Sequence, residues 1–270
     1  MATLTASGSR KVQAGFEPLV PGFIRAPFND LQAIKTIAAN REDVVAVMLE
    51  PIQGEGGIHP AEESYLRGVA ELCKANKWLL ILDEIQTGVA RTGQWYAFMH
   101  SGIQPDVLTS AKGLGNGIPI GACLMQNRAC DLLLPGTHGS TFGGNPLACA
   151  TALAVLEVIE QNNICQMVRK NSQILYDMLN ERLGSLPEVR NIRGKGYMIG
   201  VELDRPANDA RLIGLKNGLL FNVTADSVLR LLPPLIITPD EIKELVNRLE
   251  KTVHQFLEQS RSKEAEQVHI

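Results

Sequence analysis

The sequence of 270 residues lacks several features that mark whole classes of protein. It has no excess of basic residues, since its formal net charge is −3, which argues against binding to nucleic acids or to membrane surfaces. None of its apolar runs approaches the roughly 20 residues of a membrane span. Its five cysteines include no CxxC pair and its five histidines show no ligand spacing, so we expect no metal site. An odd number of cysteines in apolar stretches predicts reduced thiols in the cytoplasm rather than disulfides.

The first half of the chain carries the pattern of a parallel sheet. Two near-continuous apolar runs, VVAVMLE (44–50) and WLLILD (78–83), are typical of strands that are covered on both faces. Between them, residues 60–77 have apolar or small residues at helical spacing. Strand, helix, strand is the crossover unit of a parallel sheet. With two further strands expected at 106–111 and 118–125, the pattern predicts an α/β layer.

The second half has shorter elements. A long helix is expected to begin near Pro146, and two more helices are expected at 167–186 and 239–259. Four short strands are expected between them, at 189–193, 197–203, 218–223 and 227–232. Strands with intervening helices predict a small α+β domain. The expected parts of the chain are therefore 1–160 in a large domain, 161–258 in a small domain, and 259–270 as a polar, frayed tail.

One lysine lies between two apolar runs that are predicted to be strands. In LTSAKGLGNGIPIGACLM (108–125), Lys112 follows one run and precedes a glycine-rich turn. Lysine is costly to bury without a partner. The glycines resemble a dinucleotide-binding fingerprint, but Pro119 and a strand follow where that fingerprint requires a helix. Taken alone, Lys112 is compatible either with a reactive amine or with a solvated loop residue.

Two other stretches carry polar groups that suit a ligand. Asp83 ends the strand WLLILD, where open parallel sheets keep their ligand crevice; a carboxylate there either pairs with a cation or caps a turn. Glu84 then faces the opposite side and is expected to be a structural or solvated acid. Ser140 and Thr141, in GTHGSTFGGNP, precede a helix and together with backbone amides suit a phosphate-like anion. A plain turn that caps the helix would have the same pattern.

An amine, an acid and a phosphate cradle together suit one cofactor, pyridoxal 5'-phosphate. A lysine forms a Schiff base with its aldehyde, and a carboxylate holds its pyridine nitrogen protonated so that the ring withdraws electrons. Hydroxyls and amides bind its phosphate. The three signals point to this cofactor only in combination.

The motifs LEPIQGEGG, LDEIQTGVARTG, TSAKGLGNGIPIGA, HGSTFGGNPLA and IRGKGYMIGVEL resemble the class III pyridoxal-phosphate aminotransferases. The resemblance runs from residue 1 to about residue 258. It implies pyridoxal 5'-phosphate as cofactor and, for the large domain, part of a fold-type I transferase fold with a mostly parallel sheet covered by helices on both faces. It also implies a homodimer with the active site at the subunit interface.

The resemblance assigns roles around the cofactor ring. Lys112 would form the Schiff base and move a proton between substrate and cofactor carbons, and Asp83 would pair with the pyridine nitrogen. Ile85 would pack on one face of the ring, and Gln86 would contact its phenolic oxygen. Glu84, beside Asp83, is included among the candidate cofactor-binding residues.

The resemblance also assigns roles in binding phosphate and substrate. Thr141 would bind the phosphate of the neighbouring subunit's cofactor, and Ser140 would lie beside the substrate there. Glu55, in QGEGG, resembles a gate that pairs with Arg230, in LRLLPPL. Arg230 would take the carboxylate of glutamate or 2-oxoglutarate once Glu55 moves away, because a guanidinium suits bidentate carboxylate binding. From the residues alone, a lone arginine that extends to solvent remains open.

The closest similarity within the family implies transamination of N-acetylornithine with 2-oxoglutarate, giving N-acetylglutamate semialdehyde and glutamate in arginine biosynthesis. Succinylornithine, ornithine and γ-aminobutyrate remain open as substrates. Family members also have a long region before the position of Met1, which supplies a phosphate loop, a stacking aromatic residue and an arginine for the substrate. We therefore expect this chain by itself to be a poor enzyme, and a non-catalytic, truncated remnant is the second hypothesis.

Overall fold

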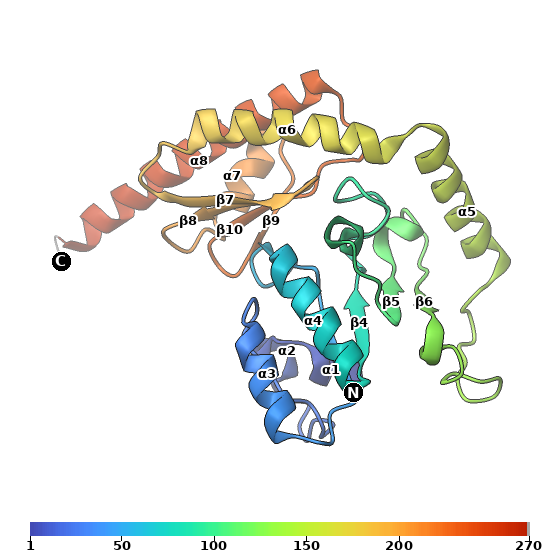
Figure 1. Ribbon diagram of the computed structural model, residues 1–270. Helices are drawn as coiled ribbons and strands as arrows, with labels where there is room; N and C mark the ends of the chain where they lie inside the picture. The colour runs from blue at the N-terminus through green and yellow to red at the C-terminus, as the bar shows by residue number, and fades with distance from the viewer. Residues whose placement is uncertain (269–270) are drawn as a thin grey trace. The chain divides into compact units, whose positions relative to one another are not determined.

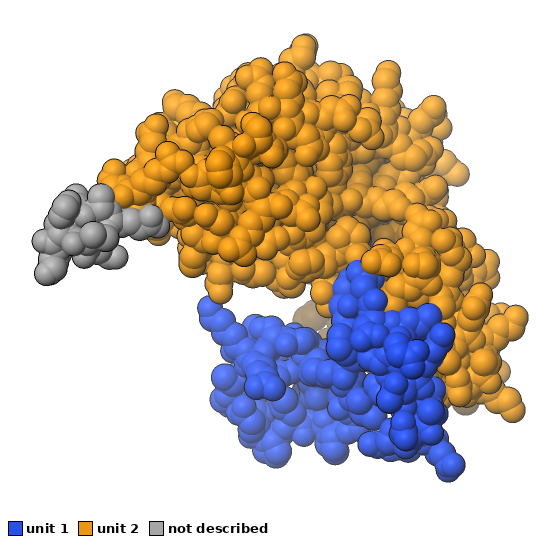
Figure 2. All heavy atoms as spheres, turned by 60° about the vertical axis from the view of Figure 1, so that its left-hand side comes forward, with its two compact units in different colours: residues 1–44 blue, residues 45–270 orange. Residues whose placement is uncertain are grey.

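A computed structural model describes the backbone of residues 1–268 and the side chains of residues 1–262 (Figure 1). The chain divides into two compact units, residues 1–44 and residues 45–270 (Figure 2). Within the described part of the chain, no helix has both the length and the apolar character that a membrane crossing requires.

The first unit is a small helical unit without a strand among its residues. Its helices are α1 (Ala2–Ala6), α2 (Arg10–Gln13) and α3 (Leu31–Asn40). The buried amide of Gln13 donates to three carbonyl oxygens at and after the end of α1, including that of Thr5. The carboxylate of Asp30 caps α3 by accepting from the backbone N–H of Ala33 at 2.9 Å. Polar side chains therefore provide hydrogen-bond partners for backbone groups that such short helices leave unpaired.

The second unit begins with a four-stranded sheet of order β1-β4-β5-β6. Its strands are β1 (Ala46–Leu49), β4 (Leu79–Asp83), β5 (Val107–Ser110) and β6 (Ala122–Met125). The first three strands are parallel, and β6 is antiparallel to β5. Helix α4 (Glu63–Asn76) connects β1 to β4 and packs on both strands. This confirms the predicted crossover and the predicted, mostly parallel sheet.

A short hairpin that the sequence pattern did not predict lies between β1 and α4. Strands β2 (Ile52–Gln53) and β3 (His59–Pro60) pair antiparallel and enclose residues 54–58. The expected helical start at Pro60 is wrong, because Pro60 pairs with Ile52 in this hairpin. The helix begins three residues later, at Glu63.

The rest of the second unit is built on an antiparallel sheet of order β7-β8-β10-β9. The strands are β7 (Val189–Lys195), β8 (Met198–Leu203), β9 (Asn222–Thr224) and β10 (Val228–Leu231). The helices are α5 (Pro146–Gln161), α6 (Ile164–Leu183), α7 (Ala210–Lys216) and α8 (Pro239–Val268). Figure 1 shows α6 and α8 on one face of this sheet. The strands predicted at 189–193, 197–203 and 227–232 are confirmed. The strand predicted at 218–223 begins later, at Asn222 of β9, and α7 was not predicted.

The two faces of the antiparallel sheet differ. On β8, Ile199, Val201 and Leu203 are fully buried in the main core with residues of α6 and α8. Their neighbours Met198 and Gly200 face the other way, because side chains alternate along a strand. There, Met198 forms a second small core with Ile52, Ile58 and Val228. The hairpin β2–β3 therefore lies on the face of the sheet that the helices leave open.

The expected polar tail is helical rather than frayed. Helix α8 continues to Val268 through most of residues 259–270, and residues 269–270 lie outside the described part. Residue 160 falls near the end of α5, and the domain boundary expected there stays a prediction.

Candidate active site

Two carboxylates lie at the carboxyl ends of neighbouring parallel strands in the first sheet. Asp83 is the last residue of β4, and Glu50 comes directly after β1. Leu49 pairs with Leu82, so Glu50 and Asp83 lie alongside each other. One oxygen of Asp83 accepts from the backbone N–H of Ile85 at 3.0 Å, which fixes the orientation of the carboxylate. Such strand ends are where parallel sheets bind ligands.

Glu50 is a site residue that the sequence analysis missed. Its carboxylate accepts from the backbone N–H of Gly54 at 3.0 Å. Burial raises its pKa, and the nearby charge of Asp83 adds to that effect. Glu50 follows an apolar strand just as Asp83 does, so the argument that selected Asp83 could also have found it.

Glu84 holds the loop after β4 together. Its side chain is fully buried and accepts from the hydroxyl of Thr87 at 2.5 Å and from the backbone N–H groups of Ala97 and Phe98 at 2.9 and 2.8 Å. Burial raises its pKa, while these donors oppose the rise. The expected structural role fits these contacts. Its inclusion among the cofactor-binding residues has no support in them, because its oxygens are committed to the chain's own loop.

Lys112 lies where β5 ends, at the start of the short 3-10 helix η2 (Lys112–Leu114). Its φ is +45°, a left-handed conformation that is uncommon for residues other than glycine and that recurs at functional sites. Burial lowers the pKa of its amine, and the charge of Arg230 lowers it further. The carboxylates of Glu55, Asp83 and Glu50 act on it in the opposite direction. These interactions place one amine among three acids and one guanidinium.

Arg230, in β10, reaches this group from the second sheet. Its Nη1 donates to Oε1 of Glu55 at 2.6 Å and to Oε1 of Gln86 at 3.4 Å. The side chain of Arg230 is 8% exposed, whereas that of Glu55 is 75% exposed. Glu55 can therefore leave the pair for water at little cost, but Arg230 cannot, since a buried charge needs a partner. The pairing expected from the resemblance is present, and its role in substrate binding stays a prediction.

Buried polar atoms without partners test whether a cofactor such as pyridoxal phosphate fits here. Within the described side chains, the hydroxyl of Thr109 and Nε of Arg230 are buried and have no hydrogen-bond partner. Thr109 pairs with Asp83 in the sheet register, so the two residues are neighbours where β4 and β5 end. Such groups are rare in folded proteins, and a ligand, an ion or water can complete their bonding. An amine, a carboxylate and unsatisfied donors fit the proposed cofactor, and no group of metal ligands occurs among the described residues.

The remaining predicted residues lie outside these contacts or at their border. Ile85 follows Asp83 and is half-buried. Ser140 and Thr141 are exposed in the segment before α5, where the hydroxyl of Ser140 accepts from the backbone N–H of Gly143 at 3.1 Å. The structure of this single chain does not bring them into the contacts around Lys112. Their expected roles across a subunit interface stay predictions.

Comparison with known proteins identifies relatives over nearly the whole chain. The family model of the class-III aminotransferases matches residues 1–253. The acetylornithine aminotransferase of Nitrosomonas europaea is 47% identical over 258 residues, which is 96% of this chain but 66% of that protein. A structure of the ornithine aminotransferase from Toxoplasma gondii, described with partial occupancy of PLP, superposes with a TM-score of 0.88 at 37% identity and covers 94% of this chain and 61% of that one. The acetylornithine aminotransferase from Elizabethkingia anophelis superposes with a TM-score of 0.82 at 38% identity, over 87% of this chain and 63% of that one.

Proposed function

This chain belongs to the class III aminotransferases, and we propose that it acts in the transamination of N-acetylornithine with 2-oxoglutarate, which gives N-acetylglutamate semialdehyde and glutamate. The observation that carries the proposal is that Lys112, Asp83 and the ion pair of Glu55 with Arg230 form one electrostatically coupled group. The relative at 47% identity is an acetylornithine aminotransferase. This relative supports N-acetylornithine as the amino donor.

Pyridoxal 5'-phosphate, when bound, supplies an electron-withdrawing ring that stabilises negative charge on the substrate carbon. Lys112 would hold it through its amine and would then carry a proton on Nζ between substrate and cofactor carbons. An amine attacks a carbonyl only when it is neutral. The lowered pKa of Lys112 favours this form and suits both roles.

Asp83 and its neighbours would orient the ring. The carboxylate of Asp83, fixed by the N–H of Ile85, would hold a proton on the pyridine nitrogen. Gln86 lies against Gly54, where an added Cβ would come within 2.7 Å of its Oε1. This close approach limits the positions open to the Gln86 amide, which we propose contacts the phenolic oxygen. Ile85 would contribute apolar contact to one face.

Arg230 would bind the carboxylate of 2-oxoglutarate or glutamate. Its buried guanidinium presents a planar set of donors, of which Nη1 is held by Glu55 and Nε is without a partner. A substrate carboxylate that displaces Glu55 would gain a bidentate contact. Glu55 would close over Arg230 again when the amino donor occupies the site, because the resemblance assigns that donor's carboxylate to an arginine in the region before the position of Met1.

We propose a homodimer in which Ser140 and Thr141 serve the partner's site, Thr141 at the cofactor phosphate and Ser140 beside the substrate. Their segment and the start of α5 expose large apolar side chains, with Phe142 81% and Leu147 67% exposed. Large apolar side chains exposed in this way favour association. We also propose a cytoplasmic location, because all five cysteines are free and Cys123 and Cys130 are exposed.

The test is to add pyridoxal 5'-phosphate to the purified chain, reduce with borohydride, and identify the modified peptide by mass spectrometry. We expect a single modified lysine, Lys112, together with new absorbance in the near-visible range. Transamination is then assayed with N-acetylornithine, succinylornithine, ornithine and γ-aminobutyrate as separate amino donors.

Modification spread over surface lysines, without absorbance specific to Lys112, would contradict the proposal and support a non-catalytic chain. Specific modification of Lys112 together with turnover of a different amino donor would instead identify that donor as the substrate.

A further inference from the structure

Two arginines lie in one row of the antiparallel sheet. Arg193 on β7 and Arg230 on β10 both pair with Gly200 on β8, which lies between them. Cross-strand partners share a face, so both side chains leave the sheet on the face that the helices do not cover. The loop of residues 54–58 meets this face, since Glu55 pairs with Arg230 and Ile58 belongs to the small core there.

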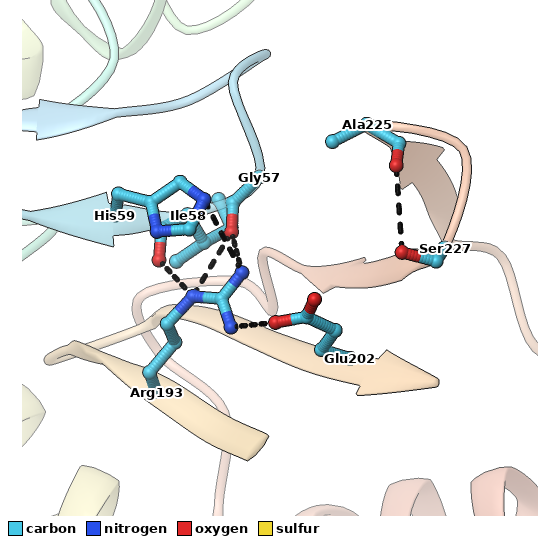
Figure 3. A network of polar contacts seen from close by, with 7 residues as sticks. All are labelled: Gly57, Ile58, His59, Arg193, Glu202, Ala225 and Ser227. Carbon is cyan, nitrogen blue, oxygen red and sulfur yellow. Dashed lines mark hydrogen bonds and ion pairs between the residues drawn. The ribbon is translucent and has the colours of Figure 1, made fainter. Parts of the chain in front are cut away.

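Arg193 binds the other end of the same loop. Its Nη2 donates to the carbonyl oxygen of Gly57 at 2.6 Å, and its Nε donates to that of Ile58 at 2.9 Å. Its Nη1 is ion-paired with Glu202, so all three guanidinium nitrogens have partners. Figure 3 shows the guanidinium extending from β7 toward Gly57–His59, with Glu202 beside it. Arg193 is 14% exposed.

The two residues that Arg193 holds have unusual backbone conformations. Gly57 has φ +112°, and Ile58 has φ +54°, which β-branched residues rarely adopt. Ile58 is fully buried over Gly200, where an added Cβ would come within 2.9 Å of the Ile58 Cβ. A conformation of this kind persists only where the surroundings determine it. Here the guanidinium of Arg193 and the missing side chain at Gly200 do so.

We propose that Arg193 is a positioning residue that fixes the Gly57–Ile58 end of the loop while the Glu55 end leaves Arg230 and returns. This inference rests on the proposed function of Arg230 as the site of a substrate carboxylate. Arg193 itself touches no substrate. It sets how well Glu55 competes for Arg230, because a loop with one fixed end returns Glu55 to the same place.

The chemistry of the two ends fits this division. The bonds from Arg193 to the loop go to backbone carbonyls, which do not titrate. The bond at the other end joins Arg230 to an exposed carboxylate that water can solvate. Gly54 and Gly56 flank Glu55, and glycine allows the chain to turn there.

The test measures loop order and carboxylate binding in the purified chain. Amide hydrogen exchange over residues 53–59 reports the loop, and calorimetric titration with glutarate reports binding at Arg230. The variants are Arg193→Gln, Arg193→Lys, Glu55→Gln and Arg230→Gln. Arg193→Gln leaves Glu202 without its cation, so the double variant Arg193→Gln/Glu202→Gln guards against unfolding. Arg190→Gln is the matched control, because Arg190 lies on the same strand but is exposed.

We expect Arg193→Gln to speed exchange over residues 53–59 by about tenfold or more, as local opening predicts. Arg193→Lys should be intermediate, because lysine lacks the planar fork. Glutarate should bind roughly two- to fivefold more tightly to Arg193→Gln and to Glu55→Gln alike, since both weaken an exposed competing carboxylate. In the double variant Arg193→Gln/Glu55→Gln, the two gains in glutarate affinity should not add, because both changes act on the contact of Glu55 with Arg230. If the loss of loop order in Arg193→Gln instead damaged the binding site, glutarate would bind more weakly.

Unchanged exchange in Arg193→Gln, or weaker glutarate binding in it with normal folding, would overturn the inference. Failure of the proposed function has a different signature: glutarate binding that does not respond to Arg230→Gln. In that case the exchange data still decide whether Arg193 anchors the loop.

Discussion

The two sheets of the second unit hold their charged groups in opposite ways. At the edge of the parallel sheet, Glu50, Asp83 and Lys112 each follow or end a strand, and the neighbouring Thr109 hydroxyl lacks a partner. On the open face of the antiparallel sheet, Arg193 lies in mid-strand with its three guanidinium nitrogens bonded to loop carbonyls and Glu202.

This difference follows from where the side chains leave the backbone. A residue at a strand end projects into a crevice and keeps bonding capacity for a ligand. A residue within a strand has a fixed direction, and a buried guanidinium there needs partners in the folded chain itself. Arg230 combines the two situations, because it is fixed within β10 but its partner Glu55 is exposed. We therefore assign reactive groups to the strand ends and recognition to the strand interior.

Among the substitutions that test this comparison, Lys112→Ala is expected to have the largest effect on activity. Removing the amine should abolish covalent attachment of the cofactor and all transamination, because Lys112 is the lysine whose amine these carboxylates act on. Absorbance in the near-visible range and mass spectrometry after borohydride reduction measure the attachment. Lys74→Ala, on the exposed side of α4, is the control and should retain both. Attachment that survives in Lys112→Ala would place the reactive amine elsewhere.

The next effect concerns the strand-end acid. Asp83→Asn keeps the shape of the side chain but removes the charge that would hold a proton on the ring nitrogen. We expect transamination to fall by several orders of magnitude, toward the roughly 10⁴-fold seen when an orienting carboxylate is neutralised in other enzymes. The cofactor should still attach to Lys112. Parallel measurement of turnover and absorbance tests this, and a near-normal rate would mean that another group protonates the ring.

Glu84, one residue further, should behave in the opposite manner. Glu84→Ala leaves the hydroxyl of Thr87 and the N–H groups of Ala97 and Phe98 without their acceptor. Unsatisfied buried donors cost about 1–3 kcal/mol each, so we expect a loss of roughly 3–5 kcal/mol in the free energy of unfolding. Urea denaturation measures it. A stable Glu84→Ala protein that had lost cofactor attachment would reverse the roles that we assign to Glu84 and Asp83.

Much of the parallel sheet could be predicted because its strands are continuous apolar runs. Asp83 stands out because such strands end at a ligand crevice, and Glu50 satisfies the same rule after β1. Lys112 stands out because a lysine between two apolar runs is costly to bury. The α6–α8 layer also follows from helical spacing. Position at a strand end is thus a signal that a single sequence contains.

The hairpin β2–β3 could not be predicted in this way, because each strand has only two residues. Pro60 looked like the first residue of a helix, since proline is favoured there, and tertiary pairing with Ile52 decided otherwise. The row of Arg193, Gly200 and Arg230 depends on the register of three strands, which local pattern does not fix. The contact of Arg193 with the loop of residues 54–58 therefore became visible only in the folded chain.

The smallest expected effect tests whether Glu50 belongs to the reactive edge. Its negative charge raises the pKa of Lys112, so Glu50→Gln should lower that pKa further, while the amide oxygen still accepts from the N–H of Gly54. Lys112 would then become neutral at a lower pH, and the pH dependence of the rate of cofactor attachment should move toward acid. Because burial raises the pKa of Glu50 itself, it is protonated at the acid end, where the variant and the original profile should converge. Glu71→Gln, an exposed change on α4, should leave the profile unchanged. A shift of the Glu50→Gln profile toward alkaline pH, or none, would remove Glu50 from the group of residues that tunes Lys112.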